Sequence, residues 1–216
     1  MTILRAKDGQ VRLWAFSLGV VILLFSGCTS LKKWAYEGFN RDKWQKPDEV
    51  IRALKIRPGD QIADVGSGSG YFTFRLAKAV LPGGRVFAAD VDEGLNQYVA
   101  DEARRQGLGN VQVILARPED PQLPKSGTDL AFTCNTYHHI ENRVSYFSNF
   151  RKYLRPNGRI AIIDFNGKGW FATLWGHYTP ADVVKEELKQ AGYELRQEFD
   201  FLPRQHFLIF AMEQGG

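Results

Sequence analysis

Short apolar runs alternate with segments of helical periodicity from residue 48 to the end of the chain. The apolar runs predict buried strands at 61–65, 85–89, 110–115, 129–135, 159–165, 194–202 and 206–212. Apolar positions at helical spacing predict helices at 48–54, 71–80, 93–106, 144–154 and 179–190. This alternation predicts an α/β fold with a doubly wound, mostly parallel, seven-stranded sheet. No helix separates the last two strands, so they should pair as an antiparallel C-terminal hairpin.

A further apolar run lies ahead of this domain and carries no charge over 13 residues, Leu13–Phe25. As a helix it would be about 20 Å long, shorter than the roughly 30 Å hydrocarbon core of a membrane. Arg12 precedes the run and small residues follow it, which is typical of a signal peptide. The run ends in Ser26-Gly27-Cys28, which resembles the lipobox of bacterial lipoproteins, although Phe25 stands where that family prefers Leu. The resemblance implies that Cys28 becomes the lipidated first residue.

Two other interpretations of this run stay open, an uncleaved signal anchor and a buried helix of the fold. Basic residues follow the run as well as precede it, so charge does not decide which side of the membrane the domain faces. The chain thus divides into a signal segment at 1–27, a tether and candidate lid at 28–46, and a domain at 47–216. We expect it to be anchored at Cys28 to a membrane of the bacterial cell envelope. The tether's aromatic side chains should pack on the domain or at the membrane interface.

Composition narrows the class of protein. A content of 44% hydrophobic and 24% charged residues is typical of a globular chain, and 216 residues allow one domain with an appendage. The formal net charge is only +4, so the domain lacks the excess of basic residues that is typical of proteins that bind nucleic acid. Two cysteines cannot build a disulfide framework, and no Cys/His cluster has the spacing of a metal site.

A glycine-rich turn between the first strand and its helix carries the functional argument. Its sequence is Asp64-Val65-Gly66-Ser67-Gly68-Ser69-Gly70, with the spacing G-x-G-x-G. A dinucleotide fingerprint has the spacing G-x-G-x-x-G and directs a helix N-terminus at a pyrophosphate. Here Asp64 stands two residues before the first glycine, where its carboxylate would repel a diphosphate and attract a cation. No Gly-Lys-Ser/Thr follows, which excludes a P-loop.

A second carboxylate ends the next strand. Asp90 lies 24 residues after Gly66, a position from which an acid can accept hydrogen bonds from both ribose hydroxyls. Together, Asp64 and Asp90 indicate an adenosine-bearing ligand with a positive amino-acid end. S-adenosylmethionine fits that description.

Five motifs in order resemble class I S-adenosylmethionine-dependent methyltransferases, near the ubiquinone and menaquinone methyltransferases of the type 11 group. They lie at 62–73, 86–92, 110–120, 128–139 and 154–165. The resemblance covers about residues 44–212 and implies S-adenosylmethionine as the cofactor. It also implies a flap over the cofactor around Trp44–Pro47, with plain packing of this segment as the alternative.

The resemblance assigns cofactor contacts residue by residue. It implies that the cofactor's amino-acid part is lined by Gly66, Ser67, Gly68 and Gly70. Asp64 would hold the ammonium, Asp90 the ribose, and Val91 would pack against the adenine. Many members have an Asp near the end of the third strand that accepts from the adenine amino group, but Arg117 stands here and cannot accept. The contact would then shift to Glu119, Asp120 or a backbone group, or be lost.

Candidates for the chemistry follow the fourth strand, where ligands of doubly wound sheets bind. Asn135, His138 and His139 should face the sulfonium methyl, with Asn135 counted among the cofactor contacts. Methyl transfer depends mostly on positioning, and a general base is needed only if the acceptor must lose a proton. His138 or His139 could be that base; the alternative is that each only caps or packs under the next helix. Asp164, at the end of the fifth strand, either serves this pocket or binds a neighbouring loop.

These features predict a membrane-tethered S-adenosylmethionine-dependent methyltransferase that acts on a small-molecule or lipid-like acceptor. The alternative is a non-catalytic lipoprotein that keeps the fold and binds a nucleoside-like ligand or a partner. A lipidated Cys28 favours this alternative, because the domain would then face away from the cytoplasm, where the cofactor is made. A hydride-transferring Rossmann enzyme ranks third because of the glycine spacing.

Overall fold

A computed structural model describes residues 40–168 and 178–213 of the chain. The predicted signal segment, Cys28 and most of the predicted tether therefore lie outside the described residues. Among the described residues, no helix combines the length and apolar character needed to cross a membrane.

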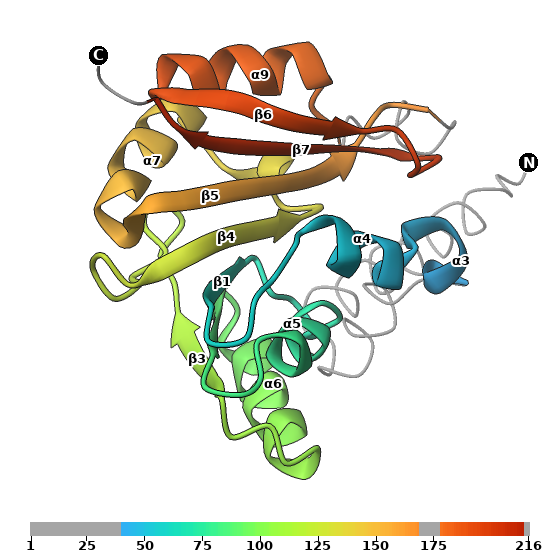
Figure 1. The fold of residues 1–216 in the computed structure, drawn as a ribbon, viewed down its shortest axis with the longest axis vertical. Coiled ribbons are helices and arrows are strands. Elements are labelled where there is room, and N and C mark those ends of the chain that lie inside the picture. Colours follow the sequence, from blue (N-terminus) through green and yellow to red (C-terminus); the bar gives the residue numbers. More distant parts are fainter. Residues whose placement is uncertain (1–39, 169–177, 214–216) are drawn as a thin grey trace, which may run out of the picture.

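A twisted seven-stranded sheet forms the centre of the molecule (Figure 1). Its strands are β1 (Gln61–Val65), β2 (Arg85–Asp90), β3 (Val111–Leu115), β4 (Thr128–Cys134), β5 (Leu154–Phe165), β6 (Tyr193–Phe199) and β7 (Gln205–Met212). The spatial order is β3-β2-β1-β4-β5-β7-β6. β1 to β5 pair in parallel, whereas β7 runs antiparallel to both β5 and β6. The predicted fold class and C-terminal hairpin are confirmed.

The strand order places a topological switch between β1 and β4. From β1 the chain builds outward through β2 to β3, and it then returns to lay β4 on the other side of β1. At such a switch the two connections leave in opposite directions, so a crevice opens at the carboxyl ends of the central strands. The glycine turn follows β1 and the Asn135–His139 segment follows β4, so both border this crevice.

Helices cover both faces of the sheet. They are α3 (Arg41–Gln45), α4 (Pro47–Ala53), α5 (Thr73–Ala79), α6 (Glu93–Arg105), α7 (Arg143–Phe150) and α9 (Ala181–Gln190), with 3-10 turns η1 (Tyr137–His139) and η2 (Arg151–Tyr153). Strand side chains alternate between two apolar clusters. Ile62 and Phe132 belong to the cluster under α4 and α5, and Ala63 and Ile162 to the cluster under α7 and α9. Burial on both faces explains why the strands are nearly continuous apolar runs.

The start of β5 differs from the prediction. The residues Pro156-Asn157-Gly158 are typical of a turn, and they stand directly before the strand predicted at 159–165. In the structure β5 begins at Leu154 and contains them. Thr128 pairs with Leu154 and Leu130 with Arg159, so the predicted turn forms an irregularity inside a longer strand. Because Leu154 pairs with β4, the strand extends across the turn residues. This pairing is a tertiary contact, so the local sequence pattern could not predict it.

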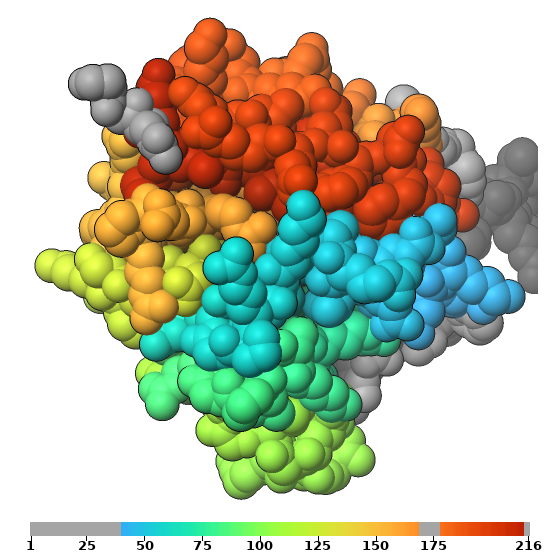
Figure 2. Space-filling model, viewed as in Figure 1, coloured from blue at the N-terminus to red at the C-terminus, as the bar shows by residue number. Residues whose placement is uncertain are grey.

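The helix α3 and the start of α4 lie against the carboxyl edge of the sheet. Figure 2 shows these segments packed between α5 and the β6–β7 hairpin. Trp44 stacks on Phe165 at the end of β5, with ring centroids 6.1 Å apart. Gln45 is fully buried, and its Nε2 donates to Oε1 of Gln205 at 3.4 Å. The part of the predicted tether that the structure describes is therefore packed on the domain.

Candidate cofactor-binding site

The glycine turn contains three residues with positive φ. Gly66, Gly68 and Gly70 have φ values of 73°, 53° and 80°, a region that favours glycine. The Gly66 N–H donates to the carbonyl of Ala89 at 2.8 Å, which ties the turn to the end of β2. A Cβ added at Gly66 would lie 2.2 Å from Oγ1 of Thr136, so the segment after β4 packs directly on the turn.

Asp90 is held at the end of β2 by two backbone donors. Its Oδ2 accepts from the N–H of Gly68 at 2.8 Å, and its Oδ1 accepts from the N–H of Asp92 at 2.9 Å. Each carboxylate oxygen has a further lone pair, so the oriented group can still accept from a ligand. Asp92 in turn caps α6 by accepting from the N–H of Leu95 at 3.0 Å, which anchors the whole β2–α6 corner.

Two cavities adjoin along the glycine turn. One includes Asp64, Ser67 and Ser69 in its wall. The other has a volume of about 320 Å³ and includes Asp90 and Val91. Both are bordered by Gly66, Gly68, Asn135 and Thr136. The turn thus separates a compartment that contains the carboxylate of Asp64 from one that contains the carboxylate of Asp90.

Asp64 is almost completely buried, with 3% of its surface exposed. Its Oδ2 accepts from Oγ1 of Thr73 at 2.6 Å. Burial raises the pKa of Asp64 to about 7, against the lowering effects of the Thr73 hydrogen bond and the Arg41 charge. The hydroxyls of Ser67 and Ser69 are buried in the same wall and have no hydrogen-bond partner. A cationic ligand with hydrogen-bonding groups would relieve both costs.

Asn135 follows β4 in the left-handed region, with φ 57°. Its Oδ1 accepts from Nε2 of Gln205 at 2.6 Å, which fixes the side chain between β4 and β7. Asn135 borders both cavities, as expected for a residue at the centre of the site.

The two histidines of η1 have different surroundings. Nδ1 of His138 lies 2.7 Å from Oδ1 of Asp164, and the His138 N–H donates to the other oxygen of Asp164 at 3.0 Å. Asp164 is fully buried and His138 keeps 6% of its side chain exposed. His139 is exposed and borders the Asp90 cavity. Both histidines line an open groove that continues to Arg143 and Glu187.

Three predicted contacts are placed elsewhere. Gly70 does not line either cavity, and a Cβ there would meet the Phe74 ring at 2.7 Å, so this glycine serves packing. Asp120 forms a salt bridge of 2.7 Å with Lys152 and accepts from the hydroxyl of Tyr153. Burial opposes its ionisation, but these hydrogen bonds outweigh it and lower the pKa of Asp120 to about 2. Glu119 is exposed and outside the cavity wall.

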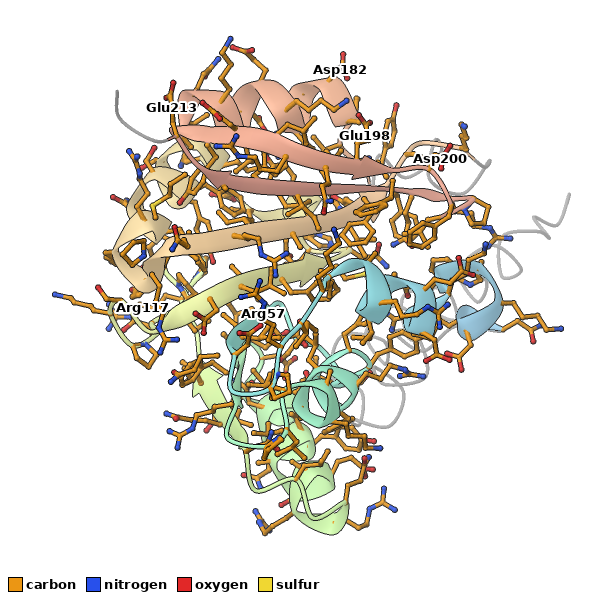
Figure 3. The ribbon with its side chains drawn as sticks, viewed as in Figure 1. Arg57, Arg117, Asp182, Glu198, Asp200 and Glu213 are labelled. Atoms are coloured by element: carbon orange, nitrogen blue, oxygen red, sulfur yellow. The ribbon has the colours of Figure 1, made fainter. Side chains whose placement is uncertain are left out.

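The adenine end of the site therefore lacks the acidic acceptor that we expected at Glu119 or Asp120. Arg117 and Pro118 border the cavity instead, and Figure 3 places Arg117 at the rim of the molecule. Of the alternatives that the sequence left open, a contact with a backbone group and the loss of this contact remain.

Some residues of the site carry no signal in the sequence. Arg41 lies in the cavity wall beside Asp64 although it is 23 positions upstream. Gln205 reaches Asn135 from a strand 70 positions downstream. Thr73, by contrast, belongs to the same motif as Asp64 and follows it by nine residues. It lies at the start of the helix after the glycine turn, where its hydroxyl reaches the Asp64 carboxylate.

Residues 56–203 match a family model described as a methyltransferase domain. The chain belongs to this family. The match begins after the end of α4 and contains the glycine turn, both aspartates and the β4 segment. It leaves α3 and α4 outside.

Named relatives agree with the family. The chain is 34% identical over 113 residues to nocamycin O-methyltransferase of Saccharothrix syringae, covering 52% of this chain and 40% of that protein. It is 26% identical over 121 residues to a ubiquinone/menaquinone biosynthesis C-methyltransferase of Ectopseudomonas mendocina, covering 56% of this chain and 47% of that protein. The chain thus spans about half the length of these relatives or less.

The fold is shared with a solved S-adenosylmethionine-dependent methyltransferase from Aquifex aeolicus. The TM-score is 0.78 at 21% identity, and the match covers 87% of this chain and all of that one. Family and fold imply S-adenosylmethionine as the cofactor, and the site fits it. The buried carboxylate of Asp64 suits an ammonium, the orphaned hydroxyls of Ser67 and Ser69 suit a carboxylate, and Asp90 suits a ribose.

Proposed function

We propose that this protein transfers a methyl group from S-adenosylmethionine to a small-molecule or lipid-like acceptor while tethered to a membrane. The observation that carries the proposal is the placement of Asp64 and Asp90 in two adjoining cavities on either side of one glycine turn. That spacing suits a molecule with a cationic amino-acid end and a nucleoside end. Asp64, Ser67 and Gly68 would hold the first, and Asp90 and Val91 the second.

When bound, S-adenosylmethionine supplies an electrophilic methyl group. The contribution of this chain is to position the acceptor and to exclude water. The groove lined by His138, His139 and Arg143 opens next to the cofactor cavities and shares His139 with one of them. It is the approach that we assign to the acceptor.

We assign His138 as general base for an acceptor that must lose a proton. The buried carboxylate of Asp164 faces Nδ1 at 2.7 Å and favours the tautomer with a proton there, so the lone pair of the neutral ring is on Nε2. His206, the cross-strand neighbour of Asp164, is buried, and burial lowers its pKa, which keeps it neutral. His139 is exposed and borders both the groove and the Asp90 cavity, so we assign it to contact the acceptor.

The membrane tether rests on the sequence of the first 28 residues. Thirteen uncharged residues before Ser26-Gly27-Cys28 support a lipoprotein signal, with lipid attachment at Cys28. A membrane anchor fits a lipid-like acceptor because it keeps the site near the bilayer surface.

Full-length protein in detergent tests the cofactor part of the proposal. We expect S-adenosylmethionine and S-adenosylhomocysteine to release heat in a calorimetric titration and NAD to release none. No heat with either sulfur ligand would refute the proposal. A panel of hydroxyl, amine and quinol acceptors with radiolabelled cofactor then tests transfer. Binding without transfer to any acceptor would favour the non-catalytic lipoprotein.

Mass spectrometry of the membrane fraction tests the anchor. We expect a mature N-terminus at Cys28 that carries acyl chains, and we expect Cys28→Ser to abolish both cleavage and acylation. An intact Met1 without acyl mass would refute lipidation.

A further inference from the structure

Three side-chain amides from distant parts of the chain are joined by hydrogen bonds beside the site. Gln45, at the end of α3 and fully buried, donates from Nε2 to Oε1 of Gln205 at 3.4 Å and to Sγ of Cys134 at 2.8 Å. Gln205, at the start of β7 and 2% exposed, donates from Nε2 to Oδ1 of Asn135 at 2.6 Å. The amide chain therefore runs from α3 through β7 to a residue that borders both cavities.

The amide chain has a fixed direction. Oε1 of Gln45 accepts from Nε of Arg41, and an arginine can only donate. Gln45 therefore turns its NH2 group toward Oε1 of Gln205, and Gln205 turns its own NH2 group toward Asn135. Both glutamines are buried, so reversing either amide would set donor against donor or acceptor against acceptor. Unpaired polar groups are costly in a protein interior, so the direction is held.

This direction decides which end of Asn135 is turned to a ligand. The oxygen and nitrogen of a side-chain amide lie on opposite branches of one plane. Because Oδ1 is turned to Gln205, the NH2 group is turned away from β7. Within the described part of the chain, Nδ2 of Asn135 has no hydrogen-bond partner. Asn135 thus presents donors, and not its carbonyl oxygen, where the two cavities meet.

The acceptor groove leads to the same place. Asn135 and His139 both border the Asp90 cavity, and His139 also lines the groove. A molecule that enters along the groove would meet the NH2 group of Asn135. That group matches an oxygen with a free lone pair, whereas an amine would bring N–H groups against it. A site with oriented donors rejects an analogue that cannot accept from them, because its own polar groups then stay unpaired.

We propose that Asn135 binds an oxygen atom of the methyl acceptor through Nδ2, and that Gln205 and Gln45 are positioning residues that keep Asn135 a donor. The acceptor is then a hydroxyl or carbonyl compound and not an amine. This inference rests on the proposed function and narrows the class of its acceptor.

Phenol and aniline are matched probes, because they share one ring and differ in whether the substituent is a good hydrogen-bond acceptor. Each is titrated into full-length protein in detergent that is saturated with S-adenosylhomocysteine. NMR follows the side-chain amide signal of Asn135, which is assigned by its loss in Asn135→Ala. We expect phenol to shift this signal and to bind about 10-fold more tightly than aniline.

Gln205→Glu tests the positioning role, because it replaces the NH2 group that faces Asn135 with a carboxylate oxygen that can only accept. Asn135 should then turn its NH2 group toward β7 and its oxygen toward the cavities. The preference for phenol should fall about 10-fold or reverse. Gln112→Glu makes the same change on the exposed side of β3 and should keep the wild-type preference.

Urea unfolding checks that Gln205→Glu is folded. If it is not, Asn135→Asp replaces the donors in place and should cause the same loss of preference. Equal affinities of wild type for the two probes, no shift of the Asn135 signal, or an unchanged preference in the variant would overturn the inference and leave the proposed function intact. Wild-type protein that does not bind S-adenosylhomocysteine would instead refute the proposed function.

Discussion

The backbone N–H of Gly68 donates a hydrogen bond of 2.8 Å to the carboxylate of Asp90. Asp90 ends β2, and Gly68 lies 22 positions earlier in the turn after the neighbouring strand β1. The bond couples the conformation of the glycine turn to the orientation of the acid, because a charged acceptor binds an N–H more strongly than a neutral one. The nucleoside compartment is therefore ordered by the protein's own contacts.

Replacing Asp90 with Ala should weaken binding of S-adenosylhomocysteine by about 1–3 kcal/mol, because the ribose hydroxyls and the Gly68 N–H lose their acceptor. Calorimetric titration measures the change. Asp101→Ala, which removes an exposed carboxylate on α6, is the matched control and should have no effect. Equal affinities for Asp90→Ala and wild type would show that the ribose binds elsewhere.

Gly66→Ala should abolish cofactor binding and lower stability by more than the roughly 1 kcal/mol expected for an alanine in a left-handed conformation. The added Cβ would lie 2.2 Å from Thr136 Oγ1. Gly107→Ala separates the effect of the positive φ from the effect of the clash with Thr136. Gly107 has φ 69°, but no atom lies within 4 Å of a Cβ added there. Urea unfolding and titration should give a small stability loss and normal binding for Gly107→Ala. Similar behaviour of both variants would contradict the close contact with Thr136.

The free energy of unfolding should depend on pH through Asp64. Burial raises its pKa from 3.8 to about 7, so between these values the folded state holds a proton that the unfolded chain releases. Unfolding is then favoured as pH rises, and stability should fall by up to about 1.4 kcal/mol per pH unit across this window. Urea unfolding at pH 5 and pH 7 measures the slope.

Asp64→Asn provides the comparison, because the amide does not titrate and keeps an acceptor for Thr73. The variant should lose less stability than wild type between pH 5 and pH 7. Parallel curves would mean that Asp64 is not the group responsible.

Asp164→Asn should lower kcat for methyl transfer by about 10–100-fold with a smaller change in KM, because an amide N–H would face Nδ1 of His138 and favour the wrong tautomer. Asp182→Asn, on the exposed side of α9 (Figure 3), should behave as wild type. An unchanged kcat in Asp164→Asn would reduce the His138–Asp164 pair to a structural role.

Much of the fold follows from local pattern. Strands 61–65 and 85–89 are observed as β1 and β2 within one residue, because a buried parallel strand must be an apolar run bounded by turns. The helix predicted at 144–154 is observed only to Phe150 and continues as the 3-10 turn η2. Helix ends and the start of β5 were the inaccurate parts, since they depend on contacts with distant strands.

The sequence by itself determined the order of strands and helices and the compartment walls at Gly66, Asp64 and Asp90. Asp64 and Asp90 lie at the carboxyl ends of β1 and β2, and Gly66 follows β1 directly. Parallel topology brings these strand ends to one edge of the sheet. Only the tertiary structure decided that Arg41 joins the site, that Asp164 faces His138, and that Asp120 is turned away to Lys152. These residues are 23 or more positions apart, and Gln45 and Gln205 are 160 apart, so no local spacing encodes their contacts. They exist because packing of the whole chain brings these side chains within hydrogen-bonding distance.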